Sequence, residues 1–152
     1  MKLTSSAFEN GTAIPPTYTQ EGENWIPPLT IDEVPSEAKS LALIVDDPDA
    51  PRGTFTHWVL FNIDPRIGSI DENAVPNGAA QGLNSAGQVG YRGPKPPNGT
   101  HRYFFRLHAL NTRLTLADGA TREQVEAAFH GRVVATAELM GRYTTGSATA
   151  IR

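Results

Sequence analysis

The chain has 152 residues, a formal net charge of −3 and a sequence pI of about 5.8, without any concentrated basic stretch. A chain of this length can bury the core of one domain, and its acidic balance argues against a general affinity for nucleic acid. The absence of cysteine excludes disulfides, thiol catalysis and cysteine-ligated zinc.

Turn-forming residues are frequent along the whole chain. There are 14 glycines and 12 prolines, scattered without a period, which favours a β-rich fold over a helical bundle. No internal repeat and no low-complexity linker divides the sequence, so we expect a single domain over residues 1–152. Residues 1–38 read as irregular apart from short strands near Lys2 to Phe8.

Three segments have the patterns of strands. Residues 40–46 form a nearly continuous apolar run between Pro35 and Pro48, which is typical of a strand buried on both faces. In residues 55–63 and 100–110, successive side chains are expected to point to opposite faces of a strand. Strict alternation places Phe55, His57, Val59, Phe61 and Ile63 on one face and Thr56, Trp58, Leu60 and Asn62 on the other. Trp58 is therefore expected in the core, facing away from His57.

The rest of the chain contains a long connection and two helical patterns. Residues 64–99 are rich in glycine, asparagine and proline, and loops of that length are usually functional or disordered. Residues 121–129 have a capping box and an apolar stripe, which predict a helix. A second helix is expected over residues 132–140, with four apolar residues inward: Val133, Val134, Ala137 and Met140.

Two segments carry the residues that are suited to chemistry. The first is residues 46–51 followed by His57, and the second is residues 90–103, which includes His101. Imidazole and phenol groups are hydrogen-bond donors, glycine-rich loops expose backbone N–H groups, and Asp47 can accept from one imidazole and favour its protonated form. If the two segments converge, they form a small rigid pocket for a phosphate-like or carboxylate-like anion.

Other interpretations of the same residues remain open at this point. A single strand histidine most often completes a structural hydrogen bond, and the cluster of Asp46, Asp47 and Asp49 is compatible with a turn or with a hard cation. A hydrolase could use His57 or His101 as general base with Asp47 as its partner. The chain has no Gly-x-Ser-x-Gly elbow that would supply a serine nucleophile.

Taken together, the two segments resemble the signatures of the phosphatidylethanolamine-binding protein family, in its bacterial Raf kinase inhibitor-like branch. The first signature reads Asp47 to Pro51 followed by His57 to Val59, and the second runs from Gly90 to Tyr103 with every fixed position present. Shorter matches near residues 22–29 and 141–143 extend the resemblance over nearly the whole chain. Two long motifs in the right order are more specific than either alone.

The resemblance implies a fold and a site. The fold is mainly β, with a large central antiparallel sheet packed on a smaller one and a few peripheral helices. The site is an anion pocket at one end of the large sheet, and the family's pattern assigns seven residues to it: Asp47, Pro51, His57, Gly93, Pro94, His101 and Tyr103. In that assignment the histidines donate to the anion, Gly93 offers a backbone N–H, Tyr103 lines the wall and the prolines shape the rim.

The resemblance also implies a function. We expect a binding protein for a small anion or phosphoryl head group, not an enzyme, with no cofactor and no metal, that acts on phosphorylated partners or signalling enzymes. The alternative is an inhibitor that docks on a kinase or protease through the segment from Ile63 to Gly90. Neither a signal peptide nor a membrane span is visible, so a cytoplasmic location is expected. A homodimer is compatible with the family.

Overall fold

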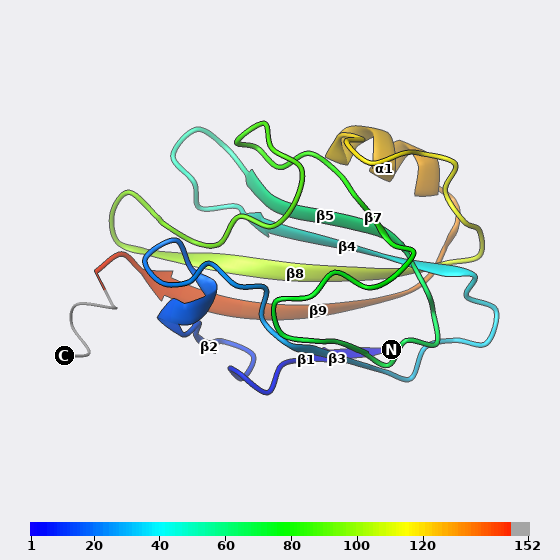
Figure 1. The fold of residues 1–152 in the computed structure, drawn as a ribbon, viewed down its shortest axis with the longest axis horizontal. Helices are drawn as coiled ribbons and strands as arrows, with labels where there is room; N and C mark the ends of the chain where they lie inside the picture. Colours follow the sequence, from blue (N-terminus) through cyan, green and yellow to red (C-terminus); the bar gives the residue numbers. More distant parts are fainter. Residues whose placement is uncertain (147–152) are drawn as a thin grey trace.

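The large central sheet and a smaller sheet form two layers (Figure 1). The computed structural model describes residues 1–146, so residues 147–152 of the expected domain lie outside the described residues. The small sheet has the order β1-β3-β6, and the large sheet has the order β2-β9-β8-β4-β5-β7. All strand pairings are antiparallel except the short contact between β2 and β9.

The elements follow one another in the chain with these bounds: β1 Lys2–Thr4, β2 Thr12–Ala13, the 3-10 turn η1 Pro16–Tyr18, β3 Leu29–Asp32, β4 Ser40–Asp47, β5 Phe55–Ile63, β6 Ser69–Ile70, β7 Ala80–Gln81, β8 Thr100–Leu110, α1 Arg122–Phe129 and β9 Val133–Thr144. The three strands expected from the sequence are confirmed as β4, β5 and β8. They lie side by side at the centre of the large sheet. Every residue of β4 is buried, as its apolar run predicted.

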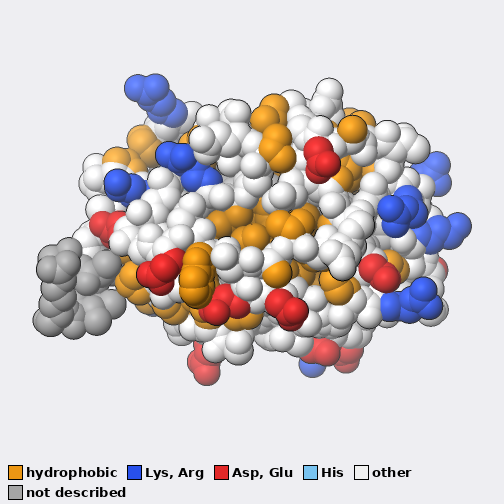
Figure 2. Space-filling model, in the orientation of Figure 1, with side chains coloured by type: hydrophobic (Ala, Val, Ile, Leu, Met, Phe, Trp, Pro, Cys, Tyr) orange, Lys and Arg blue, Asp and Glu red, His pale blue; other side chains and the backbone are white. Residues whose placement is uncertain are grey.

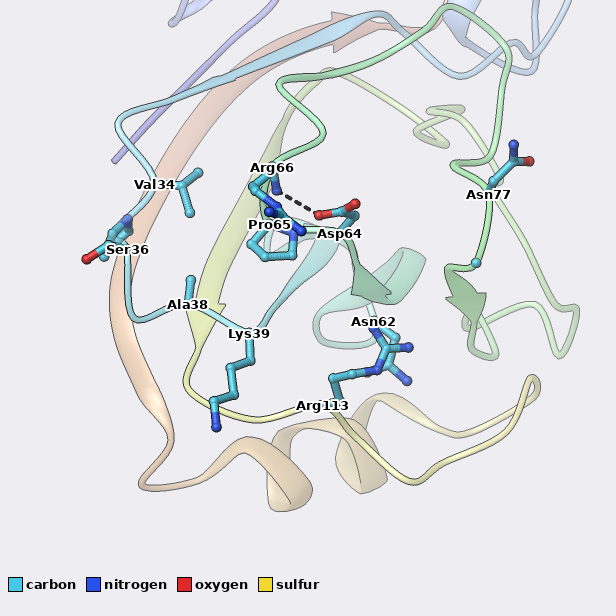
Figure 3. A pocket seen from close by; sticks show the side chains of 12 residues that line it. Val34, Ser36, Ala38, Lys39, Asn62, Asp64, Pro65, Arg66, Asn77 and Arg113 are labelled. Carbon is cyan, nitrogen blue, oxygen red and sulfur yellow. Dashed lines mark hydrogen bonds between the residues drawn. The ribbon is translucent and has the colours of Figure 1, made fainter.

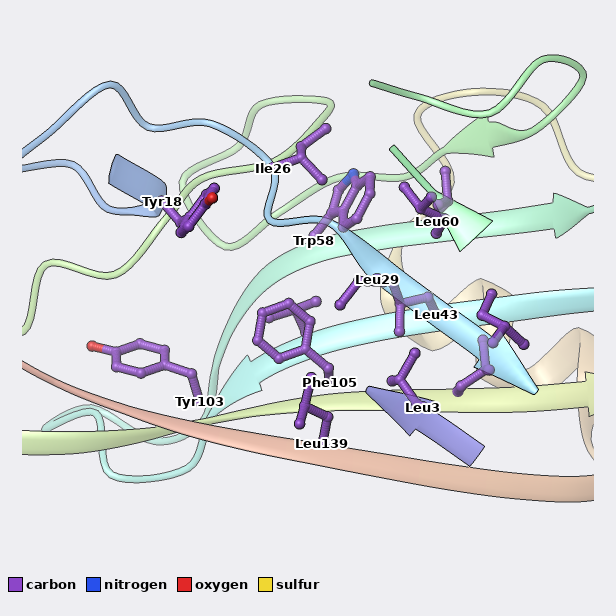
Figure 4. Close-up of a cluster of buried hydrophobic side chains, with 14 of the residues drawn as sticks. Leu3, Tyr18, Ile26, Leu29, Leu43, Trp58, Leu60, Tyr103, Phe105 and Leu139 are labelled. Atoms are coloured by element: carbon purple, nitrogen blue, oxygen red, sulfur yellow. The ribbon is translucent and has the colours of Figure 1, made fainter. Parts of the chain in front are cut away.

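The core is divided by the large sheet. Figure 4 shows the main cluster, where Leu29 of the small sheet meets Leu43, Trp58 and Phe105 of the large one. A second cluster lies on the opposite face of the large sheet, under α1, whose Val125 is completely buried. Because β4 is covered on both sides, its polar residues lie at its ends, whereas the burial of β8 alternates along its length.

The predicted helix over residues 121–129 is confirmed, and its first turn has the expected capping box. The Gln124 N–H donates to the Thr121 hydroxyl at 3.1 Å, and the Thr121 N–H donates to the Gln124 side chain at 2.9 Å. These two bonds satisfy donors that a helix start otherwise leaves unpaired. Within the part of the chain that the structure describes, no helix is long and apolar enough to cross a membrane.

The expected second helix over residues 132–140 is wrong, because this segment forms β9. It pairs with β8 from Val133 to Thr144, and its burial alternates with period two towards its end, where Leu139 and Tyr143 are buried. Its apolar spacing fits a helix locally. However, the open edge of β8 supplies hydrogen-bond partners for a whole strand, and tertiary pairing overrides a weak helical preference.

The expected faces of β5 also need correction, because two β-bulges interrupt its alternation. Thr56 pairs with Asp46 and Trp58 pairs with Val45, which leaves His57 as an extra residue. His57 and Trp58 therefore lie on the same side of the sheet. Trp58 is fully buried in the core, as expected, but it does not face away from His57.

The second bulge lies near the end of β5. Leu43 pairs with Leu60 and Leu41 pairs with Ile63, which leaves Asn62 in a left-handed conformation with φ of 56°. The long connection over residues 64–99 is not structureless, since it contains the short strands β6 and β7. β6 joins the small sheet and β7 forms an edge of the large one, so this connection links the two layers.

Candidate functional site

A pocket of about 280 Å³ opens where β4 ends and where β5 and β8 begin. Antiparallel pairing brings these three strand ends together, although they are far apart in the sequence. Five of the seven expected site residues line the pocket: Asp47, Pro51, His57, His101 and Tyr103. The other lining residues are Gln20, Ala50, Phe55, Arg92, Lys95, Pro96 and Pro97.

A buried contact between Asp47 and His101 forms the floor of the site. The His101 Nδ1 lies 2.6 Å from Oδ2 of Asp47, and both side chains are almost fully buried. Oδ1 of Asp47 accepts a hydrogen bond of 2.7 Å from the Asp49 N–H. A carboxylate can only accept, so Nδ1 of His101 carries the proton and Nε2 is the ring atom left for a ligand.

The His57 ring is also held by a hydrogen bond at Nδ1, but its acceptor is a backbone carbonyl instead of a carboxylate. Its Nδ1 lies 2.6 Å from the carbonyl oxygen of Arg92, so Nδ1 is again the donor and Nε2 remains for a ligand. Burial lowers the pKa of His57 below its usual 6.5, although the Arg92 carbonyl and the Asp47 carboxylate oppose that shift. Without a ligand, His57 is therefore expected to be neutral near pH 7.

Tyr103 contributes a hydroxyl that forms no hydrogen bond with the part of the chain that the structure describes. Among the described residues, its Oη is buried and has no hydrogen-bond partner. Burial raises the pKa of Tyr103, so this hydroxyl stays protonated and remains a donor. Figure 4 shows the ring at the end of the core cluster with its hydroxyl pointing away from the other core side chains. Its ring meets the His57 ring edge-on, with centroids 5.2 Å apart.

Gly93 and Pro94 do not line the pocket, contrary to the residue assignment above. The Gly93 N–H donates to Oδ1 of Asn24 at 2.8 Å, so it is not free for an anion. A side chain at Gly93 would place its Cβ 2.4 Å from the Tyr18 carbonyl oxygen, so glycine is needed for this close approach. The carbonyl of Pro94 accepts from the Gln20 N–H at 3.0 Å. These two residues therefore hold the loop rather than the ligand.

The wall of the pocket includes residues that the sequence reasoning missed. Phe55 precedes His57 by two positions, so alternation along β5 could have identified it. The Arg92 side chain comes from the second motif, but its lining role follows only from the path of the loop. Gln20 comes from the irregular first segment, and its side-chain amide donates to the Gly93 carbonyl at 2.8 Å. No local signal marks Gln20 as a site residue.

The three neighbouring aspartates point to different partners and do not form a cation site. Asp49 receives two hydrogen bonds from the Arg102 guanidinium, which lowers the pKa of Asp49 to about 2. Asp46 lies on the opposite face, 3.1 Å from Arg106 and 2.9 Å from Arg122. Among residues 1–146, no group of three or more histidine, aspartate or glutamate side chains is arranged to hold a metal.

Three comparisons place the chain among known proteins. The family model described as phosphatidylethanolamine-binding protein matches residues 4–144. A UPF0098 protein of Methanothermobacter thermautotrophicus is 52% identical over 151 residues, which cover 96% of this chain and 100% of that one. A UPF0098 protein of Chlamydia trachomatis is 46% identical over 148 residues, which cover 94% of this chain and 98% of that one.

Solved structures give the same result. The phosphatidylethanolamine-binding protein homologue CT736 of Chlamydia trachomatis superposes with a TM-score of 0.92 at 45% identity, over 95% of this chain and 97% of that one. YbcL of Escherichia coli, described as a member of the mammalian phosphatidylethanolamine-binding protein family, gives a TM-score of 0.88 at 31% identity, over 94% and 97% of the two chains. The expected mainly-β fold with two packed sheets is thereby confirmed.

Proposed function

Because the chain belongs to the phosphatidylethanolamine-binding protein family, we propose that its pocket binds a small anion of the phosphoryl or carboxylate type and that it does so without turnover. The observation that carries the proposal is the meeting of three polar atoms to which the described residues offer no hydrogen-bond partner. Nε2 of His57, Nε2 of His101 and Oη of Tyr103 belong to residues that line one small pocket.

The electrostatic balance of the lining supports an anionic ligand. Among the described residues that line the pocket, Asp47 is the one carboxylate, and both of its oxygens already accept hydrogen bonds. Arg92 and Lys95 add two positive charges to the lining. The Asp47 carboxylate also holds Nδ1 of His101, so Nε2 is the ring atom that remains for the ligand.

The size and stiffness of the pocket support a head group rather than a whole lipid. Pockets for drug-sized ligands are usually about 300–1,000 Å³, and this pocket measures about 280 Å³. Its wall is built from Pro51, Pro96 and Pro97, and the Pro96 carbonyl accepts a hydrogen bond from the Thr145 hydroxyl. Prolines restrict the backbone, so little conformational entropy is lost when a ligand binds.

The groups beside the two imidazoles support the proposal of binding without turnover. The residues that line the pocket, within the described part of the chain, include no serine or threonine hydroxyl that either ring could activate. The lining also contains the Tyr103 hydroxyl, whose raised pKa keeps it protonated, so it remains a donor and is a poor nucleophile. A panel of phosphoesters and carboxylic esters should show no hydrolysis above that in buffer.

The test is an NMR titration of the histidine ring signals with phosphate, phosphoethanolamine and acetate. We expect saturable shifts for His57 and His101 in the wild-type protein and their loss in His101→Ala. His130→Ala is the matched control, because His130 is exposed and lies outside the pocket. A phosphoserine peptide forms a further arm, since a phosphorylated partner protein presents the same chemical group. If neither ring responds to any of these ligands at millimolar concentration, the proposal is wrong.

A further inference from the structure

A second and larger hollow lies at the opposite end of the central strands. It measures about 850 Å³ and is lined by residues from before β4, after β5 and after β8. Because these strands are antiparallel, the start of β4 and the ends of β5 and β8 meet there. β4 has eight residues, and a strand of that length spans roughly 25 Å. This end is therefore separate from the pocket of the proposed function.

Basic side chains surround this hollow. Lys39, Arg66 and Arg113 each come from a different connection, and Figure 3 shows them around the same space. All three are exposed, and none forms an ion pair with another of the described residues. Figure 2 shows basic side chains at this end of the molecule, where β4 begins. The chain as a whole has a net charge of −3, so the positive charge around this hollow contrasts with the overall charge of the protein.

Within residues 1–146, the lining of the hollow has one carboxylate and three cationic side chains. Asp64 lines it, and its Oδ1 accepts a hydrogen bond of 2.9 Å from the Arg66 backbone N–H. The lining also includes the hydroxyl of Ser36 and the side-chain amide of Asn77. Donors and positive charge therefore outnumber acceptors and negative charge, which is the balance expected of an anion site.

Hydrogen bonds fix the backbone segments that carry Lys39 and Arg113. The buried amide of Asn62 donates to the Leu114 carbonyl and accepts from the Leu114 N–H, both at 2.8 Å. The Lys39 N–H donates to the Leu110 carbonyl at 2.7 Å. Asn62 occupies the second β5 bulge, so this irregularity places the Arg113 segment next to the β5 end. A preformed backbone lowers the entropy cost of binding.

We infer that this hollow, which we call the rear groove, binds a chain of linked phosphates, as in an inorganic or organic polyphosphate. Two guanidinium groups suit phosphate because each can donate two parallel hydrogen bonds, and the ammonium group adds a point charge. A single phosphate could contact only part of a hollow of about 850 Å³. A chain of linked phosphates can reach Lys39, Arg66 and Arg113, which lie on three separate connections. The rear groove has no residue in common with the lining of the first pocket.

The test is a titration of the whole protein with inorganic tripolyphosphate in magnesium-free buffer, followed by amide NMR. We expect saturable shifts at the backbone amides of Asn62 and Leu114 that persist in His101→Ala, which disables the first pocket. Arg66→Gln and Arg113→Gln should each weaken this binding about three- to fivefold, as expected for exposed charges. Rising salt should weaken it in all variants.

Two further variants make the result specific. Asp64→Asn removes the lining carboxylate but keeps the oxygen that accepts from Arg66, so it should strengthen tripolyphosphate binding about threefold. Arg142→Gln removes an exposed arginine on β9 outside the rear groove and should leave tripolyphosphate binding unchanged. The inference is overturned if tripolyphosphate binding disappears in His101→Ala, or if the Arg66, Arg113 and Asp64 variants behave like Arg142→Gln.

Discussion

His101 and Asp47 are 54 positions apart in the sequence, yet Nδ1 of the imidazole lies 2.6 Å from Oδ2 of the carboxylate. The first residue lies at the start of β8 and the second at the end of β4, which are neighbouring antiparallel strands. The contact determines which ring nitrogen is left for the proposed ligand. It also places a negative charge on the Nδ1 side of the ring.

Replacement of this carboxylate by a neutral amide tests its role. We expect Asp47→Asn to weaken phosphate binding about tenfold or more, because a hydrogen bond to a charged group contributes about 1.5–3 kcal/mol. Isothermal titration calorimetry measures the change. Asp49→Asn is the matched control, because Asp49 pairs with Arg102 and does not line the pocket. Equal losses in both variants would show that the effect is not specific to the His101 contact.

Removal of the Tyr103 hydroxyl should separate stability from binding. A buried donor without a partner costs about 1–3 kcal/mol, so Tyr103→Phe should raise the free energy of unfolding in the absence of ligand. The same change should weaken phosphate binding, because one donor to the anion is lost. Urea denaturation and calorimetry measure the two quantities. A variant that is less stable than wild type would indicate that the hydroxyl already has a partner in the free protein.

The pH dependence of stability should follow from two imidazoles, the buried one of His57 and the half-buried one of His108. Burial lowers the pKa of His57 and of His108 below 6.5, so the unfolded chain takes up protons that the folded chain does not. The free energy of unfolding should therefore be fully retained above about pH 6.5 and should fall as the pH drops below it. Urea denaturation across this range gives the slope.

Two changes should make the slope of stability against pH smaller. One acts on the contribution of His108 and the other on that of His57. His108→Leu removes a ring whose Nδ1 is buried without a partner among the described residues and which packs on Phe129. Saturating phosphate should act on the His57 contribution, because a bound anion stabilises the protonated ring. An unchanged slope in both experiments would contradict the assignment of the effect to these histidines.

The close packing of Gly93 can be tested by one methyl group. In Gly93→Ala the new Cβ would lie 2.4 Å from the Tyr18 carbonyl oxygen, and backbone atoms cannot move away easily. We expect a loss of about 3 kcal/mol in stability, at the upper end of overpacking costs, together with weaker phosphate binding as the loop shifts. Gly68→Ala is the control. Alanine would be strained at the φ of 74° that Gly68 adopts, but its Cβ would have none of the described atoms within 4 Å. It should lose stability and keep its phosphate affinity.

The local patterns of the sequence were sufficient for the central strands and for α1, and the resemblance to the family's signatures supplied five of the residues that line the pocket. Apolar runs and alternation bounded by proline and glycine are local properties, and they predict β4, β5 and β8 correctly. The capping box of α1 is equally local. His57 and His101 were predictable as partners because each lies at the start of a strand, beside a motif rich in glycine, proline or aspartate.

Only the tertiary structure decided the features that depend on pairing between distant segments. β9 is a strand because β8 offers it an edge, and the bulge at His57 turns that ring to the side of Trp58. Gly93 supports the loop because the Tyr18 backbone passes close to it. The rear groove exists because three connections meet at one end of the sheet. Periodicity describes what one segment prefers, whereas register, bulges and loop contacts are set by whichever neighbour satisfies the backbone groups.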